Sequence, residues 1–177
     1  MFINPKKAIR EGWLKGVPEA DIQPNAVDIA VETLWEIDVD SKFYLWHNDK
    51  NHRTREELKP TQLGTESHAY QDMWKFKKGK VYDFMSPAYV EMPKGVVGWL
   101  VTRSTLNRNG VFVLSGLYDS GYKGHINGIL YNKCGESWVQ PGSRVAQFIM
   151  AASDSEGLYT GSYNVNEGEL WHEKLVN

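Results

Sequence analysis

Residues 96–132 read VVGWLVTRSTLNRNGVFVLSGLYDSGYKGHINGILYN and contain three apolar runs separated by turn residues. The apolar runs span residues 96–102, 111–114 and 124–131. Asn109-Gly110 lies between the first two runs, and Asp119-Ser120-Gly121 precedes the third; such residues are typical of turns between strands. This stretch therefore predicts a succession of short strands.

The same pattern continues on both sides of this stretch. Further apolar or alternating runs occur at residues 26–32, 34–39, 81–84, 89–92 and 145–151. Many short strands with frequent turn residues indicate a sandwich or a barrel. The sequence therefore predicts a mainly β protein.

One helix is expected, at the start of the chain. Asn4 can cap it, and Pro5 suits the first helical position. Trp13 and Leu14 continue its apolar face, and Gly16 suits its end.

Residues 47–71 are polar and show almost no periodicity. Such a stretch is long for a loop in a compact domain, so we expect an irregular excursion or a functional lid. With 177 residues, the whole chain 1–177 otherwise suits a single domain.

Composition excludes several classes of function. With 20 basic and 22 acidic residues, the chain lacks the basic excess of a nucleic-acid-binding protein. No apolar run approaches the ~20 residues that span a bilayer, so no membrane association is expected. Cys134 is the single cysteine, which rules out an internal disulfide and indicates a soluble, cytoplasmic protein.

Common motifs for metals and phosphates are missing. The sequence has no Gly-x-x-x-x-Gly-Lys-Ser/Thr and no Gly-x-Gly-x-x-Gly after a strand. His47 and His52 flank Asp49, but their polar surroundings favour a loop over a zinc site. A zinc site is therefore not expected.

Four segments carry more reactive groups than turns require: residues 22–28, 103–108, 116–124 and 142–147. Arg103, Ser104, Thr105 and Arg108 supply guanidinium and hydroxyl groups, which bind phosphate oxygens. Asp119, at a turn, could take a proton from an attacking water. Taken singly, each of these residues also has a simpler structural interpretation as a cap, a turn acid or a surface charge.

In this order, the segments resemble the motifs of the dCTP deaminase/dUTPase superfamily, trimeric β-clip enzymes that act on deoxypyrimidine triphosphates. The similar segments are IQPNAVD (22–28), RSTLNR (103–108), residues 116–132, RVAQ (144–147) and YTGSY (159–163). The resemblance covers about residues 22–168 except 40–72. It implies a β-clip, or distorted jelly-roll-like barrel, with a short N-terminal helix, assembled as a homotrimer with nucleotide pockets at the subunit boundaries.

The resemblance also implies a role for each site residue. Asp119 would be the catalytic acid that orients water for attack on the α-phosphorus, and Asp28 would be a supporting acid near metal-bound waters. Mg²⁺ would arrive on the deoxynucleoside triphosphate, without a direct protein ligand. The implied substrate-binding residues are Arg103, Ser104, Thr105, Arg108, Tyr122, Gln147, Tyr159 and Tyr163.

Three hypotheses follow from this resemblance. The first is a hydrolase that converts dUTP, or a related dNTP, to the monophosphate and pyrophosphate. The alternative is a dCTP deaminase, but Ile129 stands where deaminases carry a proton-shuttling glutamate, so another acid such as Glu32 or His125 would be needed. The third is a non-catalytic nucleotide-binding trimer. The hairpin between Gly110 and Asp119 is one or two residues shorter than usual, which leaves the preferred base open.

Overall fold

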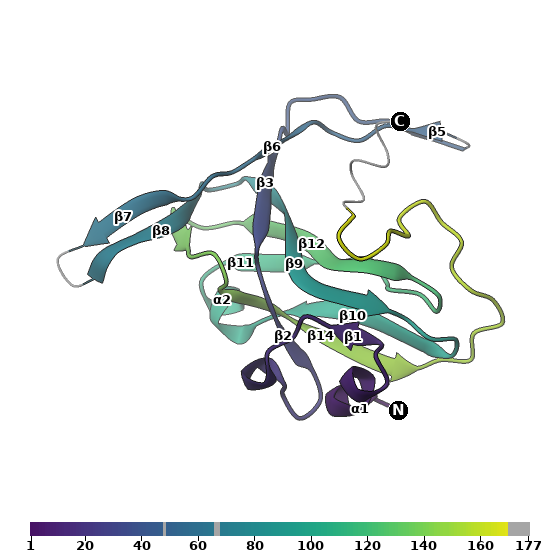
Figure 1. Cartoon of the computed structure of the whole chain (residues 1–177). Coiled ribbons are helices and arrows are strands. Elements are labelled where there is room, and N and C mark those ends of the chain that lie inside the picture. The colour runs from purple at the N-terminus through teal and green to yellow at the C-terminus, as the bar shows by residue number, and fades with distance from the viewer. Residues whose placement is uncertain (48, 66–67, 170–177) are drawn as a thin grey trace.

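The structure, a computed structural model, describes residues 1–47, 49–65 and 68–169. Within these residues, one sheet has six strands in the order β11-β12-β9-β3-β6, with β1 also paired to β9. A second sheet has the order β10-β14-β2, and the smaller pairings β13-β8-β7 and β4-β5 extend the fold (Figure 1). The prediction of a mainly β fold with a short N-terminal helix is confirmed.

The elements have the following bounds. The six-stranded sheet contains β1 (Leu14–Lys15), β3 (Thr33–Ile37), β6 (Arg55–Glu57), β9 (Val81–Glu91), β11 (Val111–Leu114) and β12 (Lys123–Asn132). The second sheet contains β2 (Val27–Ala30), β10 (Val96–Thr102) and β14 (Arg144–Ala152). The remaining elements are β4 (Leu45–Trp46), β5 (Asp49–Lys50), β7 (Thr61–Thr65), β8 (His68–Phe76), β13 (Ser137–Val139), the helices α1 (Pro5–Arg10) and α2 (Ser104–Arg108), and a 3₁₀ turn, η1 (Glu19–Asp21).

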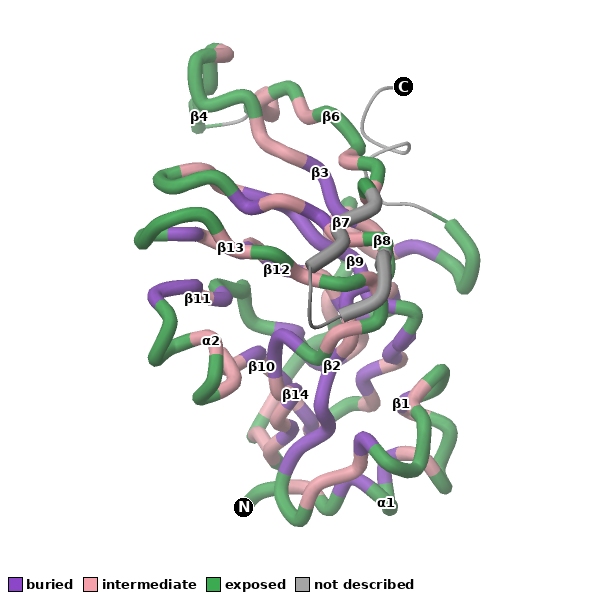
Figure 2. The backbone as a smooth tube through the Cα atoms, turned by 90° about the vertical axis from the view of Figure 1, so that its left-hand side faces the viewer, coloured by how far each residue is buried: buried purple, intermediate pink, exposed green. Residues whose placement is uncertain are grey.

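The two main sheets share one hydrophobic core. Phe84 and Leu130 of the larger sheet and Leu100 and Phe148 of the smaller sheet belong to the same buried cluster. Figure 2 shows buried backbone along β2, β10, β14 and β9, whereas β4 and β6 are mostly exposed. Apolar burial of this kind is the main favourable term in folding.

Helix α1 is shorter than the sequence predicts. The Asn4 side chain accepts a hydrogen bond from the Lys6 N–H at 2.9 Å, as expected of a cap, but the helix ends at Arg10. Gly12 has a φ of +74°, a left-handed conformation that stops the helix before Gly16. In the described part of the chain, no helix is long and apolar enough to cross a membrane.

Strand β9 joins two stretches, 81–84 and 89–92, that the sequence predicts as separate strands. Its pairing with β12 shifts register between His125 and Asn127, opposite Pro87. A proline lacks the N–H that a regular ladder needs, and the irregularity places it where no ladder bond is lost. One long strand can therefore run past the proline.

The expectation of an irregular segment at 47–71 is wrong for the described residues, because β5, β6, β7 and part of β8 lie there. Figure 1 shows β7 and β8 as a ribbon that projects from the body of the molecule. Strands that leave the core need no apolar alternation, which explains why the sequence pattern missed them. Asn48 and residues 66–67 lie outside the described residues.

Candidate active site

A cavity of about 440 Å³ opens where the two arms of the β11–β12 hairpin separate. Leu114 still pairs with Ile129, but the chain then turns towards β10. The Leu100 N–H donates to Ser115 Oγ at 3.0 Å, and Tyr118 pairs with Gly98. One arm of the hairpin therefore leaves the larger sheet for the smaller one, while the other arm stays in the larger sheet. The space between the arms is large enough for a small ligand.

Three tyrosines that the sequence predicts to bind substrate line this cavity: Tyr122, Tyr159 and Tyr163. Tyr122 is buried, and its ring meets that of Tyr159 edge-on at 5.9 Å between centroids. Burial raises the pKa of Tyr122 to about 12, so its phenol stays protonated near neutral pH. Aromatic walls of this kind favour stacking with a flat heterocycle.

A second wall of the cavity comes from the segment between β5 and β6. His52 lines the cavity, and its ring meets that of Tyr163 edge-on at 6.3 Å between centroids. Lys50 Nζ donates to the Tyr163 hydroxyl at 3.2 Å. Burial, with the positive charges of Arg55 and Lys50, lowers the pKa of His52, which is therefore neutral at pH 7. The sequence raised a functional lid as one interpretation of residues 47–71, but it did not single out His52 as a residue of the cavity.

The charged end of the cavity is formed by Asp83 of β9 and Arg55 of β6. The Arg55 guanidinium donates to the Asp83 carboxylate, and the side chains are only 15% and 7% exposed. Burial raises the pKa of Asp83 to about 6, although Arg55 acts in the opposite direction. We name these two residues the Asp83–Arg55 pair. The sequence carries one signal for it, an acid in the middle of the apolar run VYDFM.

Asp83 lies directly beside Ile129, its cross-strand partner on β12. Ile129 is therefore inside the cavity, where its side chain cannot transfer a proton. Glu32 and His125, the acids considered as replacements, do not line the cavity. His125 instead packs edge-on against Tyr89 at 5.5 Å between centroids.

The Tyr118 side chain joins the two arms of the hairpin at the same cavity. Its hydroxyl accepts a hydrogen bond from the Asn127 N–H at 3.0 Å and donates to the Asn127 carbonyl oxygen. Burial raises the pKa of Tyr118 far above its ordinary value. The Asn127 N–H is therefore already bonded within the protein.

A separate cluster joins three of the motifs around Asp28, which is buried in β2. Gln147 Nε2 donates to Asp28 Oδ1 at 3.0 Å, and an Arg103 guanidinium nitrogen lies 3.4 Å from Oδ2. Gln23 Nε2 also donates to Oδ2, at 3.3 Å. We name these residues the Asp28 cluster. Its carboxylate holds a guanidinium and an amide side by side, as a phosphate site requires.

Helix α2 follows Arg103 directly and carries the other residues of the second motif. Ser104, Thr105 and Arg108 are all exposed there. Their hydroxyl and guanidinium groups thus lie at the same end of β10 as the Asp28 cluster.

Asp119 lies at the other end of β10. It is exposed, and its carbonyl oxygen accepts a turn hydrogen bond from the Tyr122 N–H at 3.0 Å. Its neighbour Tyr118 pairs with Gly98, and the strand from Gly98 to Arg103 spans roughly 17 Å. A single chain therefore does not bring Asp119 to the Asp28 cluster.

Among the residues that the structure describes, no three His, Cys, Asp or Glu side chains form a group that could hold a metal ion. Both carboxylate oxygens of Asp28 are already engaged by Gln23, Gln147 and Arg103.

Known proteins similar to this chain are dCTP deaminases and dUTP nucleotidohydrolases. The family model described as dCTP deaminase-like matches residues 5–153. A probable deoxyuridine 5′-triphosphate nucleotidohydrolase of Halobacterium salinarum is 29% identical over 147 residues, which are 83% of this chain and 85% of that protein. A dCTP deaminase of Caldivirga maquilingensis is 36% identical over 76 residues, 42% of either chain.

A solved structure supports the fold. The 2′-deoxycytidine 5′-triphosphate deaminase from Agrobacterium tumefaciens superposes with a TM-score of 0.64 at 13% identity. The similarity covers 86% of this chain but 48% of that deaminase, so this chain spans about half its length.

Proposed function

Because the chain belongs to the dCTP deaminase-like family, we propose that it is a nucleotide hydrolase that converts dUTP, or a related dNTP, to the monophosphate and pyrophosphate. The observation that carries this choice is Ile129, which occupies the cavity where a deaminase would need a proton-transferring acid. A relative that matches 83% of the chain is named as a probable dUTP nucleotidohydrolase, whereas the deaminase from Caldivirga matches 42% of it.

In this proposal, the nucleoside lies in the tyrosine-lined cavity, with Tyr122 against the deoxyribose and Tyr159 and Tyr163 closing over it. The phosphates are bound by Arg103 and Gln147 of the Asp28 cluster, together with Ser104, Thr105 and Arg108. Asp28 acts as a positioning residue, because its buried carboxylate fixes the directions of the Arg103 and Gln147 side chains.

Asp119 would be the catalytic base that accepts a proton from the water attacking the α-phosphorus, with pyrophosphate leaving. Its exposure on a turn suits a group that must meet a ligand at the surface. Mg²⁺ bound to the triphosphate would neutralise part of its charge. Asp28 is not assigned as a direct ligand of this metal, because its carboxylate oxygens already have protein partners.

The separation of Asp119 from the Asp28 cluster supports assembly as a homotrimer. Each active site would combine Asp119 of one copy with the Arg103 and Gln147 side chains of another. A closed ring of identical head-to-tail contacts supplies such a site once per subunit. We place the reaction in the cytoplasm, where deoxynucleotides are used.

The test is one incubation of pure protein with Mg²⁺ and each deoxynucleoside triphosphate, with pyrophosphate and ammonia measured in the same sample. Pyrophosphate without ammonia is expected from dUTP. Ammonia from dCTP would establish the deaminase instead, and no product from any substrate would favour a nucleotide-binding protein.

The matched variants are Asp119→Asn and Asp154→Asn, which both remove an exposed acid. Loss of a catalytic base costs about 10²- to 10⁴-fold in rate. Asp119→Asn should therefore lower kcat at least about 10²-fold, while substrate still binds. Asp154→Asn should retain activity. Normal turnover by Asp119→Asn would overturn the role given to Asp119.

A further inference from the structure

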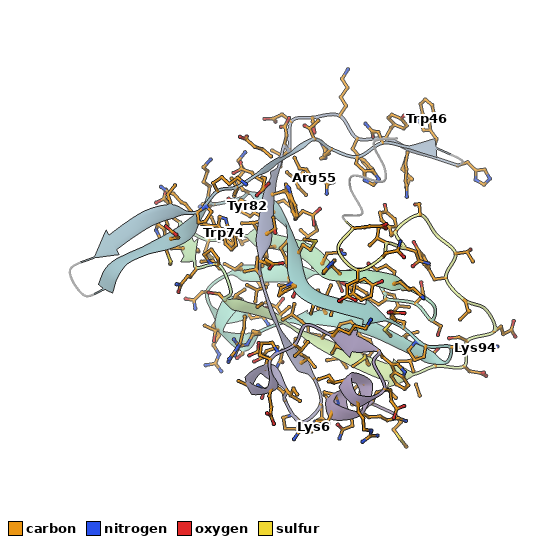
Figure 3. The ribbon with its side chains drawn as sticks, viewed as in Figure 1. Lys6, Trp46, Arg55, Trp74, Tyr82 and Lys94 are labelled. Carbon is orange, nitrogen blue, oxygen red and sulfur yellow. The ribbon has the colours of Figure 1, made fainter. Side chains whose placement is uncertain are left out.

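The pairing of the larger sheet places the Asp83–Arg55 pair at the cavity. Asp83 lies between Trp35 on β3 and Ile129 on β12, and Arg55 lies opposite Ile37 on β3. Cross-strand partners share one face of a sheet, so Asp83 and Ile129 face the same side. Figure 3 shows Arg55 beside β3, the strand with which β6 pairs.

Packing alone does not account for this pair. Asp83 is itself buried, and so is Trp35, its cross-strand neighbour on the same face of the sheet. A buried ion pair in such surroundings is costly to desolvate, and apolar residues of similar volume often serve stability equally well. A charged pair at the end of a cavity therefore suggests a role in binding a ligand.

The backbone of Asn127, another polar group at the cavity, is already hydrogen-bonded within the protein. The Asn127 N–H is bonded to the Tyr118 hydroxyl, which also donates to the Asn127 carbonyl. The tyrosine walls offer mainly ring faces. The Asp83–Arg55 pair provides a carboxylate acceptor and guanidinium donors side by side.

We propose that Asp83 and Arg55 bind the hydrogen-bonding edge of a pyrimidine base and set the base preference of the site. Asp83 accepts a hydrogen bond from a base N–H, and Arg55 donates to the adjacent carbonyl oxygen or ring nitrogen. In uracil these groups are N3–H and a neighbouring carbonyl. This inference rests on the proposed function, because it assigns the cavity to the base of the nucleotide.

The test measures binding rather than turnover. Titration calorimetry with dUMP, dCMP and dTMP would be carried out on the wild type, Asp83→Asn and Arg55→Gln, with pyrophosphate as a probe without a base. The matched control is Glu36→Gln, which removes another sheet carboxylate that is paired with Lys77 and Lys80 and lies outside the cavity. Thermal unfolding of each variant would verify that it is folded.

Loss of a hydrogen bond to a charged group should weaken binding of the preferred monophosphate by about 10- to 100-fold. Asp83→Asn and Arg55→Gln should also reduce discrimination among the three bases, while pyrophosphate binds as in the wild type. Glu36→Gln should change neither. If Asp83→Asn does not fold, Arg55→Gln decides the result.

The outcomes separate this inference from the proposed function. A wild type that binds monophosphates selectively but hydrolyses no triphosphate would refute the hydrolase and leave base recognition to be judged from the variants. Unchanged affinities and unchanged discrimination in both variants would overturn the inference even if the hydrolase is active. A wild type that binds none of the three monophosphates would also overturn it.

Discussion

At the scale of single residues, two buried carboxylates have different surroundings. The Asp28 carboxylate accepts hydrogen bonds from the Gln23 and Gln147 side chains and forms an ion pair with Arg103, so its charge interacts with several partners. Asp83 has Arg55 as its charged partner and lies in an apolar strand. Desolvation is the larger influence on Asp83, and its pKa rises from 3.8 to about 6.

This raised pKa predicts an unusual pH dependence of stability. The folded protein binds the Asp83 proton more tightly than the unfolded chain does. The contribution of Asp83 to stability is therefore complete below about pH 4 and is lost as the pH rises through about 6. Relative to Asp83→Asn, which does not titrate, the wild type should lose about 2 kcal/mol of unfolding free energy between pH 4 and 7.

Urea unfolding of both proteins at several pH values measures this difference. The comparison with Asp83→Asn cancels the titration of groups that the two proteins share. A difference that stays constant from pH 4 to 7 would contradict the raised pKa.

Residues in local motifs could be found from the sequence, whereas the Asp83–Arg55 pair could not. Arg103, Ser104 and Asp119 lie in short segments whose residue types suggest phosphate chemistry. Asp83 and Arg55 are 28 positions apart and meet only because β3 lies between β6 and β9. No local spacing encodes that contact.

At the scale of elements, prediction worked where strands alternate or end in clear turns. The runs at 96–102 and 111–114 became β10 and β11 with the expected bounds. The end of α1 was predicted at Gly16, whereas the left-handed Gly12 stops the helix earlier. The continuity of β9 was not predicted, because it depends on pairing with distant strands. Leu14, assigned to the helix face, pairs instead with Val90 of β9.

Gly16 offers a test of this contact between β1 and β9. Its φ is +69°, and an added Cβ would lie 2.7 Å from the Pro87 carbonyl oxygen. Gly12 has a similar φ of +74°, but nothing lies within 4 Å of its Cβ position. Gly12→Ala should cost about 1–2 kcal/mol of stability from backbone strain, and Gly16→Ala should cost about 1–3 kcal/mol more from the steric clash.

Denaturant unfolding of the two alanine variants gives both values. Since the two glycines share the left-handed conformation, the difference between them isolates the contact with Pro87. Equal losses of stability would mean that β9 moves away from β1 without cost.

At the scale of the whole molecule, the two halves of the proposed site lie at opposite ends of β10. In the sequence, Asp119 and Arg103 are 16 positions apart. The fold then separates them, because Arg103 follows the end of β10 whereas Tyr118, next to Asp119, pairs with Gly98. Proximity in sequence therefore does not identify the chain that completes each site.

Mixing inactive variants determines which chains contribute. Arg103→Gln and Asp119→Asn should each be inactive alone, since each lacks one half of every site. If a site uses Arg103 of one copy and Asp119 of the next, every mixed trimer regains one intact site. Random mixing in equal amounts makes about three quarters of the trimers mixed, so the sample should recover about a quarter of wild-type pyrophosphate release.

The two variants would be unfolded together and refolded, so that their subunits exchange. The control mixes Arg103→Gln with the double variant Arg103→Gln/Asp119→Asn, which can form no intact site and should stay inactive. Recovery in the first mixture alone would show that one chain provides the phosphate-binding residues and another provides the base. A first mixture that stays inactive, although an affinity tag on one variant co-purifies the other, would mean that both residues serve one site from the same chain, and β10 would then have to rearrange when the nucleotide binds.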